Sequence, residues 1–456
     1  MNKFQSINPY NGQLLAEFEL LLPQQINEKL DLARNAFKNW SLKGFAERQK
    51  LMKAVAHQLM LNKEALARLI TLEVGKPISE SYAELEKCAW TCDFYADHAA
   101  EYLVPEIINT DATESFVRFD PLGCILAVMP WNFPFWQVFR FAAPALMAGN
   151  TAVLKHAANV PQCALAIEDI FKSSGYPEGI FQSLLISNEA TEQVINHDVV
   201  KAVTLTGSER AGSDVAMKSG KALKKTLLEL GGSDAFIVLN DADLDFTTEM
   251  ALKSRMINTG QSCIAAKRFI VDASIHDQFA ELMKTKMENL VSGNPLDQST
   301  QVGVLARKDL AENLWRQVDE SVKQGAKVIT GALKPEGAYF KPTILVNVKK
   351  GMPAYEEELF GPVATIIKAI DVEHAIELAN DNRYGLGSSV WTKNIENAKF
   401  IAGRIEAGSV FINGIVKSDA RLPFGGVKKS GYGRELSGYG IKEFVNVKTV
   451  WVGGRQ

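Results

Sequence analysis

From residue 124 onward, short apolar segments alternate with stretches of helical periodicity, and no other feature of the sequence constrains the fold as strongly. In the first part of this region, strands are predicted at 124–129, 151–154, 181–186 and 199–206, and helices near 161–173 and 189–196. Strands and helices that alternate in this way indicate a parallel sheet covered by helices on both faces.

A second alternating series begins at residue 235. Its strands are predicted at 235–239, 268–272, 327–330, 343–346, 364–369, 388–391 and 409–412. The chain is therefore predicted to be an α/β protein with two doubly wound parallel sheets. No internal repeat, low-complexity tract or Pro-rich linker separates the two units, so they are expected to pack against each other.

The flanking regions follow other patterns. Residues 25–100 carry apolar residues at three- and four-residue intervals, which predicts helices, and a Gly-Lys-Pro turn at 75–77 interrupts them. Residues 104–121 contain short strand-like pieces and are predicted to form a hairpin that leaves the main body. Residues 444–452 alternate like a strand with no helix after it. Because an unpaired strand needs a partner, another subunit could provide one.

The charge of the chain is nearly balanced, with 50 Lys and Arg residues against 53 Asp and Glu residues among 456. No segment gathers enough basic residues to bind a polyanion, so nucleic acid is not an expected partner. No apolar run approaches the roughly 18 residues that cross a bilayer. The polar beginning of the sequence lacks the apolar core of a secretory signal, and a cytoplasmic location without a membrane partner is predicted.

The five cysteines are too few for a disulfide framework, and their odd number leaves at least one thiol free. Cys88 and Cys92 are expected to be buried on one helix, since no second pair or histidine cluster would complete a zinc site. The six histidines are scattered singly. A metal-dependent mechanism is therefore not expected.

Two segments that follow predicted strands carry residues suited to ligand binding or catalysis. Residues 201–212 read as a strand, a turn at Gly207 and a helix start, whose free N–H groups suit a pyrophosphate. The spacing differs from G-x-G-x-x-G, so a plain strand-to-helix turn is the alternative. Glu229 ends an apolar strand before two glycines, where burial would raise its pKa and suit it to general-base catalysis. A helix cap or an ion pair with a lysine is the alternative.

Two further segments carry a thiol and an amide. Cys263 ends a polar loop at 258–263, where substrates can reach it, whereas Cys124 lies in an apolar strand. An inert buried cysteine is the alternative. Asn132 lies between two prolines at the carboxyl end of a predicted strand, where open α/β sheets bind ligands. Its amide could donate a hydrogen bond to an oxyanion, and a rigid structural turn is the alternative.

Together with two later segments, these elements resemble the aldehyde dehydrogenase superfamily over essentially the whole chain. The matching motifs, in order, are PWNFP at 130–134, TGS at 206–208, LELGG at 228–232, NTGQSC at 258–263, EELFGPV at 357–363 and PFGG at 423–426. The resemblance implies an aldehyde dehydrogenase-like fold with a protruding β oligomerisation element. It implies a dinucleotide-binding domain of residues 1–103, 122–231 and 430–442, a catalytic domain of residues 232–429, and an oligomerisation element of residues 104–121 and 443–456.

The same resemblance implies an NAD(P)-dependent enzyme without a metal. Cys263 would be the nucleophile that forms a thiohemiacetal and then a thioester, Glu229 the general base, and Asn132 the oxyanion donor. Lys155, Ser208 and Glu358 would hold the adenosine ribose, the pyrophosphate and the nicotinamide ribose. The full set of predicted coenzyme-binding residues is Pro130, Trp131, Lys155, Ala158, Thr206, Gly207, Ser208, Leu230, Glu358 and Phe360.

Arg140 lies in an otherwise apolar run, and its guanidinium needs an anionic partner. A substrate carboxylate is the favoured partner because the position resembles the carboxylate-binding arginine of succinate semialdehyde dehydrogenases; an internal ion pair is the alternative. The predicted substrate-binding residues are Arg140, Trp136, Ser418 and Phe424. The runs at 155–159 and 231–244 most resemble the bacterial Sad-type branch of these enzymes.

Three departures from related patterns leave questions open. An animal-type second arginine, six residues before the nucleophile, is replaced by Ile257, with Arg255 two residues earlier. Asp419 and Arg421 could form a pair that stabilises the loop around Ser418. Many NAD-selective members carry a Glu at the position of Ala158, so this chain is expected to accept NADP as well as NAD.

The resemblance also implies a homodimer or homotetramer, built through the 104–121 hairpin and the 444–452 strand. The predicted activity is oxidation of succinate semialdehyde to succinate, and a broader or different aldehyde specificity is the first alternative. A non-catalytic structural role, as in some lens crystallins, is the second alternative, and the complete set of Cys263, Glu229 and Asn132 argues against it.

Overall fold

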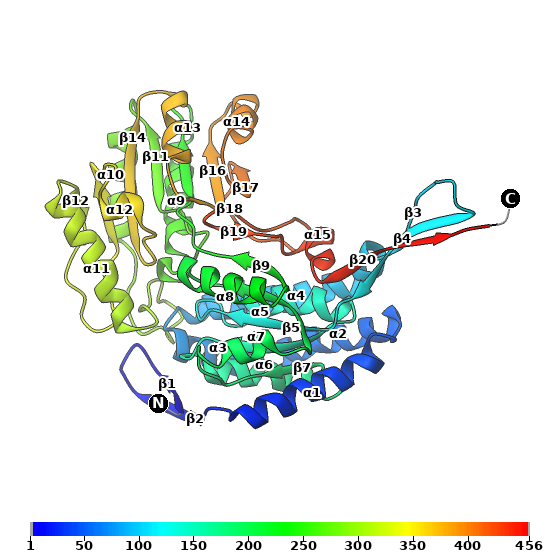
Figure 1. Cartoon of the computed structure of the whole chain (residues 1–456). Helices are drawn as coiled ribbons and strands as arrows, with labels where there is room; N and C mark the ends of the chain where they lie inside the picture. The colour runs from blue at the N-terminus through cyan, green and yellow to red at the C-terminus, as the bar shows by residue number, and fades with distance from the viewer. Residues whose placement is uncertain (1–2, 455–456) are drawn as a thin grey trace.

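The computed structural model describes residues 3–454 and contains two large sheets, each covered by helices (Figure 1). The six-stranded sheet has the order β19-β9-β8-β5-β6-β7. Its strands are β5 (Cys124–Met129), β6 (Thr151–His156), β7 (Phe181–Ser183), β8 (Val200–Thr206), β9 (Lys225–Glu229) and β19 (Gly431–Tyr432). All neighbours are parallel except β19, which runs antiparallel to β9.

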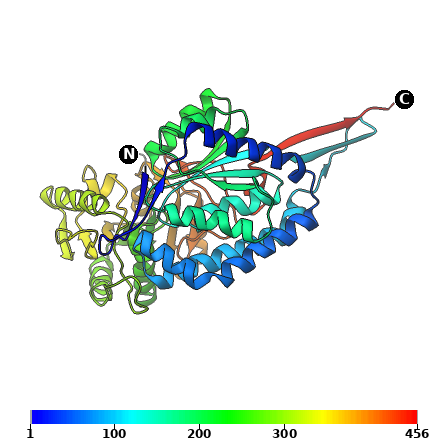
Figure 2. The ribbon, with the colours of Figure 1, turned by 90° about the horizontal axis from the view of Figure 1, so that it is seen from below.

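Helices cover both faces of this sheet, as the alternation of the sequence predicts. They are α1 (Pro23–Trp40), α2 (Phe45–Leu61), α3 (Lys63–Val74), α4 (Ile78–Tyr102), α5 (Trp136–Met147), α6 (Pro161–Ser173), α7 (Thr191–Asn196) and α8 (Glu209–Lys221). Alternate residues of β5 enter different cores: Ile125 packs in the core that α4 and α5 share, and Leu126 packs with Leu30 of α1. Figure 2 shows α1, in dark blue, lying along one face of the sheet.

The seven-stranded sheet has the order β12-β13-β14-β11-β10-β16-β17. Its strands are β10 (Ala235–Val238), β11 (Arg268–Asp272), β12 (Lys327–Thr330), β13 (Thr343–Val346), β14 (Val363–Ala369), β16 (Gly387–Trp391) and β17 (Ser409–Ile412). Only β12 is antiparallel to its neighbour. Helices α9 (Leu244–Met256), α10 (His276–Glu288), α11 (Lys308–Lys323), α12 (Pro353–Glu356), α13 (Val372–Asn380) and α14 (Ile395–Ala402) accompany it. The prediction of two doubly wound sheets is confirmed, with one antiparallel edge strand in each.

A narrow third sheet projects from the body as a long ribbon (Figures 1 and 2). It consists of β3 (Glu106–Ile107), β4 (Glu114–Pro121) and β20 (Val445–Val452) in the order β20-β4-β3. The predicted hairpin is confirmed, but the expectation of an unpaired terminal strand is wrong. β20 pairs with β4 of the same chain along its whole length, since the two strands have equal length and an unbroken antiparallel register. Its other edge has no partner strand among the described residues.

The beginning of the chain forms an antiparallel pair that the sequence did not reveal. β1 (Lys3–Ile7) pairs with β2 (Leu14–Glu19), and the two strands are amphipathic only weakly, with most of their side chains partly exposed. The remaining short elements are β15 (Tyr384–Gly385), β18 (Val427–Lys428) and α15 (Ser437–Lys442). Over residues 3–454, no helix has both the length and the apolar character needed to cross a lipid bilayer.

The expectation for Cys88 and Cys92 is confirmed, since both lie fully buried on α4. The turn before α4 also forms as predicted. Gly75 ends α3 with a φ of +82°, in the left-handed region that favours glycine, and α4 begins after Pro77.

Candidate active site

The loop that carries Cys263 is bent by three consecutive left-handed residues. After α9 ends at Met256, Asn258 and Thr259 each have a φ of +53° and Gly260 has a φ of +78°. Hydrogen bonds offset the strain of the two non-glycine residues. The backbone N–H of Asn258 donates to Glu80 Oε2 at 2.6 Å, and Thr259 Oγ1 accepts from the N–H of Gly303 at 3.0 Å.

Cys263 follows this bend and lines a cavity of about 520 Å³. The buried Lys267 ammonium donates to the carbonyl oxygen of Cys263 at 2.7 Å, which fixes the backbone beside the thiol. Burial raises the pKa of the Cys263 thiol to about 12, although the nearby Arg140 and Lys267 cations act in the opposite direction. The thiol therefore needs a proton acceptor before it can act as a nucleophile.

Asn132 is buried and is tied to the same loop from the end of β5. Its Nδ2 donates to the backbone carbonyl oxygen of Gln261 at 3.0 Å, and the backbone carbonyl oxygen of Asn132 accepts from Asn258 Nδ2 at 2.6 Å. An amide nitrogen has two protons, so one N–H of Asn132 stays available for another acceptor. Hydrogen bonds thus hold Asn132 against Asn258 and Gln261 of the loop that ends at Cys263.

Glu229 ends β9 as a buried carboxyl group without a hydrogen bond to either side-chain oxygen within residues 3–454. Burial raises its pKa well above the ordinary value, and the nearby Glu435 carboxyl acts in the same direction. Arg140 and Arg434 oppose this shift only in part. The burial predicted from the apolar strand is confirmed, and a carboxyl group with a raised pKa binds a proton more readily than an exposed one.

Arg140 is almost fully buried on α5, and its Nε forms an ion pair with the equally buried Glu435. Its Nη2 donates to Thr206 Oγ1 at 3.2 Å, and its Cζ lies 4.8 Å from the centre of the Phe424 ring. The internal ion pair that sequence reasoning held as the alternative is therefore present. Arg140 also lies among the residues that line the cavity beside Cys263.

The other predicted substrate residues lie on the walls of the same cavity. Trp136, Ser418 and Phe424 all line it, so the structure brings this set together with Cys263. Ser418 Oγ accepts a hydrogen bond from Lys87 Nζ at 2.8 Å.

The questions left open around this loop have structural answers. Asp419 and Arg421 do form a pair, with Nη2 2.7 Å from Oδ2. Arg255 is fully buried and donates to the carbonyl oxygen of Gly260 at 2.6 Å, so it does not line the cavity, whereas Ile257 does.

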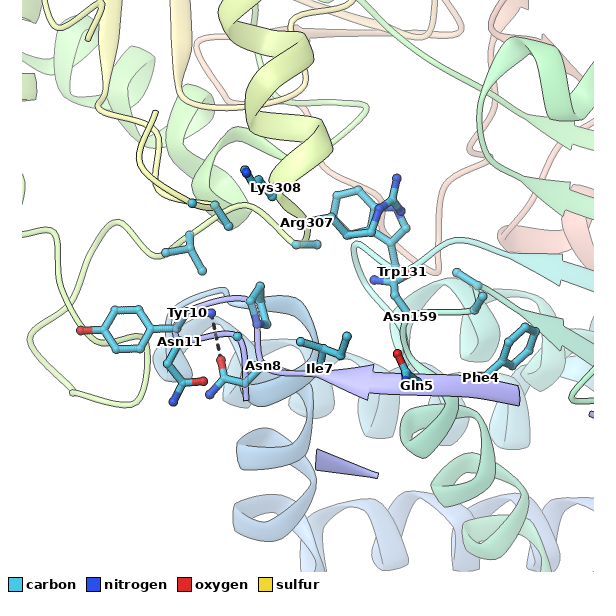
Figure 3. A pocket seen from close by; sticks show the side chains of 18 of the residues that line it. Phe4, Gln5, Ile7, Asn8, Tyr10, Asn11, Trp131, Asn159, Arg307 and Lys308 are labelled. Carbon is cyan, nitrogen blue, oxygen red and sulfur yellow. Dashed lines mark hydrogen bonds between the residues drawn. The ribbon is translucent and has the colours of Figure 1, made fainter. Parts of the chain in front are cut away.

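A second cavity, of about 1380 Å³, adjoins part of the predicted coenzyme set (Figure 3). Trp131, Lys155 and Ala158 line it from the six-stranded sheet, and the β1–β2 pair and the start of α11 line it from the other sides. Lys155 Nζ donates to Asn188 Oδ1 at 2.7 Å. Burial lowers the pKa of Lys155 to about 8, which leaves a weakly satisfied cation suited to a hydroxyl or phosphate group.

The other predicted coenzyme residues lie outside the lining of this cavity. Ser208 caps α8 by accepting from the N–H of Ala211 at 3.3 Å, and it follows Thr206 and Gly207 at the end of β8. Leu230 packs against Gly212, where a Cβ would lie 2.5 Å from Leu230 Cδ2. The backbone N–H groups in the first turn of α8 are of the kind that bind an anionic ligand.

Glu358 and the aromatic pair lie between the two sheets. Glu358 Oε1 accepts from the N–H of Gly232 at 3.1 Å and lies 3.4 Å from Lys267 Nζ. The Phe360 and Trp131 rings meet edge to face, 5.8 Å apart, and Trp131 follows Pro130 at the end of β5. These residues fit a nicotinamide coenzyme, since they offer a helix N-terminus, a buried cation and a carboxylate that can accept from a ribose hydroxyl.

Sequence reasoning missed three charged residues of this region: Glu435, Lys87 and Lys267. None belongs to a motif with a chemical spacing. Glu435 and Lys87 meet their partners only through the tertiary fold, whereas Lys267 contacts the carbonyl oxygen of Cys263 four residues before it. The described residues hold no group of three His, Cys, Asp or Glu side chains arranged to bind a metal ion.

Comparison with known proteins agrees with this geometry. Residues 1–450 match the model of the aldehyde dehydrogenase family. A probable succinate-semialdehyde dehydrogenase [NADP(+)] from Synechocystis is 51% identical over 98% of this chain and 99% of that protein. The succinate semialdehyde dehydrogenase [NAD(P)+] Sad of Escherichia coli is 45% identical over 98% of this chain and 97% of that protein.

Solved structures give the same result. The crystal structure of succinic semialdehyde dehydrogenase from Streptococcus pyogenes, in complex with NADP+, matches with a TM-score of 0.97 and 38% identity, over 99% of this chain and 100% of that one. Both the motifs and the full-length similarity lead to one conclusion: this chain belongs to the aldehyde dehydrogenase family.

Proposed function

We propose that the protein oxidises succinate semialdehyde to succinate with NAD or NADP as the hydride acceptor. The observation that carries this proposal is the 520 Å³ cavity, which is lined by both Cys263, with its thiol, and Arg140, with its guanidinium. One group attacks an aldehyde, and the other suits a carboxylate on the same molecule. The relatives in Synechocystis and Escherichia coli carry names that state this activity.

Cys263 begins the reaction by adding its sulfur to the aldehyde carbon. The thiol proton passes to a base. We assign this role to Glu229, because its raised pKa makes it a strong proton acceptor once it is ionised. The carbonyl oxygen becomes an oxyanion, and the free N–H of Asn132 stabilises it. When bound, the nicotinamide coenzyme supplies the acceptor for the hydride that leaves this carbon. Loss of the hydride turns the Cys263 adduct into a thioester.

Glu229 then releases the proton that it took from Cys263 to solvent. It completes the cycle by accepting a proton from water while the water oxygen attacks the thioester carbon. The carbon–sulfur bond then breaks, the acid is released, and Cys263 leaves as a thiolate that recovers a proton. Glu229 suits this role because no other side chain competes for its oxygens within the described residues.

Coenzyme binding is assigned to the residues around β8, α8 and the larger cavity. Lys155 would hold the adenosine ribose, Ser208 and the first turn of α8 the pyrophosphate, and Glu358 the nicotinamide ribose. Ala158 leaves no carboxylate to repel a 2′-phosphate, and no carboxylate within the described residues forms an ion pair with Lys155. Both coenzymes should therefore be accepted.

The assembly is proposed to be a homodimer or homotetramer. The support is the projecting ribbon of β3, β4 and β20, whose exposed apolar side chains include Ile107, Val447 and Trp451. The domain division proposed above groups the chain by sheet, with the ribbon as the oligomerisation element. A cytoplasmic location is proposed because all five cysteines are free thiols, which suits a reducing compartment.

The proposed activity is tested by comparing kcat/KM for succinate semialdehyde and for butanal, which lacks the carboxylate, with each coenzyme in turn. We expect the carboxylated substrate to be preferred by about 100-fold, since a desolvated charged contact contributes roughly 2–3 kcal/mol. Cys263→Ala should lose all turnover, whereas Cys88→Ala, a buried thiol on α4, should remain active. Equal rates for the two aldehydes would refute the substrate assignment.

A further inference from the structure

A second cation enters the cavity from α4, at a residue to which the motifs give no role. Lys87 is half-buried and lines the same cavity as Cys263. Its Nζ donates to Ser418 Oγ at 2.8 Å and lies 4.1 Å from the centre of the Trp136 ring. Both of these contacts are residues that we assign to the substrate.

Unlike two other cations close to it, Lys87 has no counter-ion within residues 3–454. Arg140 pairs with Glu435 and Lys76 pairs with Glu84, whereas no carboxylate among residues 3–454 forms an ion pair with Lys87. A hydroxyl and an aromatic face attract an ammonium group but do not neutralise its charge. Burial and the charge of Arg140 lower the pKa of Lys87 to about 8, which reflects this unsatisfied positive potential.

We propose that Lys87 is a specificity-determining residue that binds the distal carboxylate of the substrate together with Ser418 and Arg140. This inference rests on the proposed function and adds a residue to it. The carboxylate would supply the missing negative charge between two cations.

The orientation of Ser418 supports this arrangement. Because Ser418 Oγ accepts from Lys87, its own hydroxyl proton stays free to donate to a carboxylate oxygen. Lys87 therefore acts in two ways: its charge attracts the carboxylate directly, and its hydrogen bond orients the serine. The stacking on Trp136 limits the freedom of the flexible lysine chain, so less entropy is lost when the substrate binds.

The test is Lys87→Met, which keeps the apolar stem over Trp136 and removes the charge. We expect kcat/KM for succinate semialdehyde to fall about 10- to 30-fold, mostly through KM, and kcat/KM for butanal to change less than about threefold. Lys87→Arg should recover a large part of the loss because it restores the charge. Lys63→Met is the matched control, since Lys63 also lies over an aromatic ring, Tyr82, at 5.4 Å, but outside the cavity.

The pH dependence gives a readout that a purely structural role would not produce. The charged and titratable groups that act on Lys87 are Arg140 of α5, Cys88 of its own helix, and Lys417 and Asp419 of the facing loop. Glu80 and Glu84 line the same cavity. As pH rises above about 8, Lys87 loses its proton, so the ratio of kcat/KM for succinate semialdehyde to that for butanal should fall. The ratio cancels the titrations of Cys263 and Glu229, and Lys87→Met should abolish the fall.

Three results would overturn the proposal. The first is a folded Lys87→Met protein that loses both substrates equally, and the second is one that keeps its full preference for succinate semialdehyde. In both cases, a native protein that prefers succinate semialdehyde would leave the proposed function intact.

If the native protein shows no preference for succinate semialdehyde, the proposed function fails. Inhibition of butanal oxidation by succinate then tests Lys87 separately. The third result that would overturn the proposal for Lys87 is an inhibition constant for succinate that is the same in Lys87→Met as in the native protein.

Discussion

At the scale of single residues, the site combines two buried carboxyl groups with one guanidinium. Arg140 pairs with Glu435, and the negative charge of Glu435 helps to raise the pKa of Glu229. Arg140 and Arg434 offset the burial of Glu229 only in part, so the two buried acids favour the protonated form more than exposed carboxyl groups do. The raised pKa makes Glu229 a stronger base, once ionised, than an exposed carboxylate.

The first prediction concerns Glu229→Gln. Only the carboxylate form accepts a proton, and its pKa is raised, so native kcat should increase as pH rises through that pKa. Glutamine cannot accept the proton, and kcat should fall about 10²- to 10⁴-fold and lose this increase. Steady-state rates measured between pH 5.5 and 9 test both effects. Glu229→Asp should keep the pH-dependent increase at a lower rate. A glutamine variant with the native pH profile would contradict the assignment.

At the scale of elements, the turn between α3 and α4 fixes the start of α4, the helix that carries Lys87. Gly75 adopts a φ of +82°, and a Cβ there would lie 2.6 Å from Val304 Cγ2 and 2.9 Å from Pro9 Cγ. Its carbonyl oxygen accepts from the N–H of Val304 at 3.0 Å. The helix that follows carries Lys87, so an error at this turn would displace a wall of the cavity.

We predict that Gly75→Ala lowers the thermal unfolding midpoint, because it combines a left-handed backbone with steric overlap. The expected destabilisation is about 2 kcal/mol or more. Gly220→Ala in α8 is the control. It has no atom within 4 Å of the added carbon and an ordinary helical φ, so it should stabilise the protein by about 0.5–1 kcal/mol. Equal midpoints for the two variants, measured by circular dichroism, would disprove this account.

At the scale of the whole molecule, the ribbon of β3, β4 and β20 extends away from the rest of the chain (Figure 1). β20 is an edge strand with Val447 61% and Trp451 56% exposed. Exposed apolar edge strands are avoided in monomers because they pair with other chains. The ribbon is therefore the surface on which we expect subunits to associate.

The corresponding prediction is that Val447→Glu combined with Trp451→Glu reduces the oligomer to a smaller species. Two charges placed in an apolar interface lose hydration without gaining partners. Light scattering after size-exclusion chromatography measures the mass. Leu333→Glu, at a residue 59% exposed on the other lobe, should leave the mass unchanged. A native mass in the double variant would place the interface elsewhere.

The sequence by itself determined the α/β architecture with its two alternating series, the helical opening region, and the hairpin. These features depend on local periodicity, which any window of the chain contains. It also singled out Cys263, Asn132, Arg140 and Ser418 as candidate site residues, and the structure brings three of these four, Cys263, Arg140 and Ser418, into the lining of one cavity. The buried state of Glu229 likewise followed from its place at the end of an apolar strand.

Only the tertiary structure decided which charges meet. Glu435 reaches Arg140 from almost 300 positions away, and Lys87 meets Ser418 across a separation of 331 residues. The pairing of β20 with β4 and the β1–β2 pair at the edge of the larger cavity also escaped prediction. No local pattern encodes such contacts, because the energy of a buried charge depends on its distance to other charges in the folded chain.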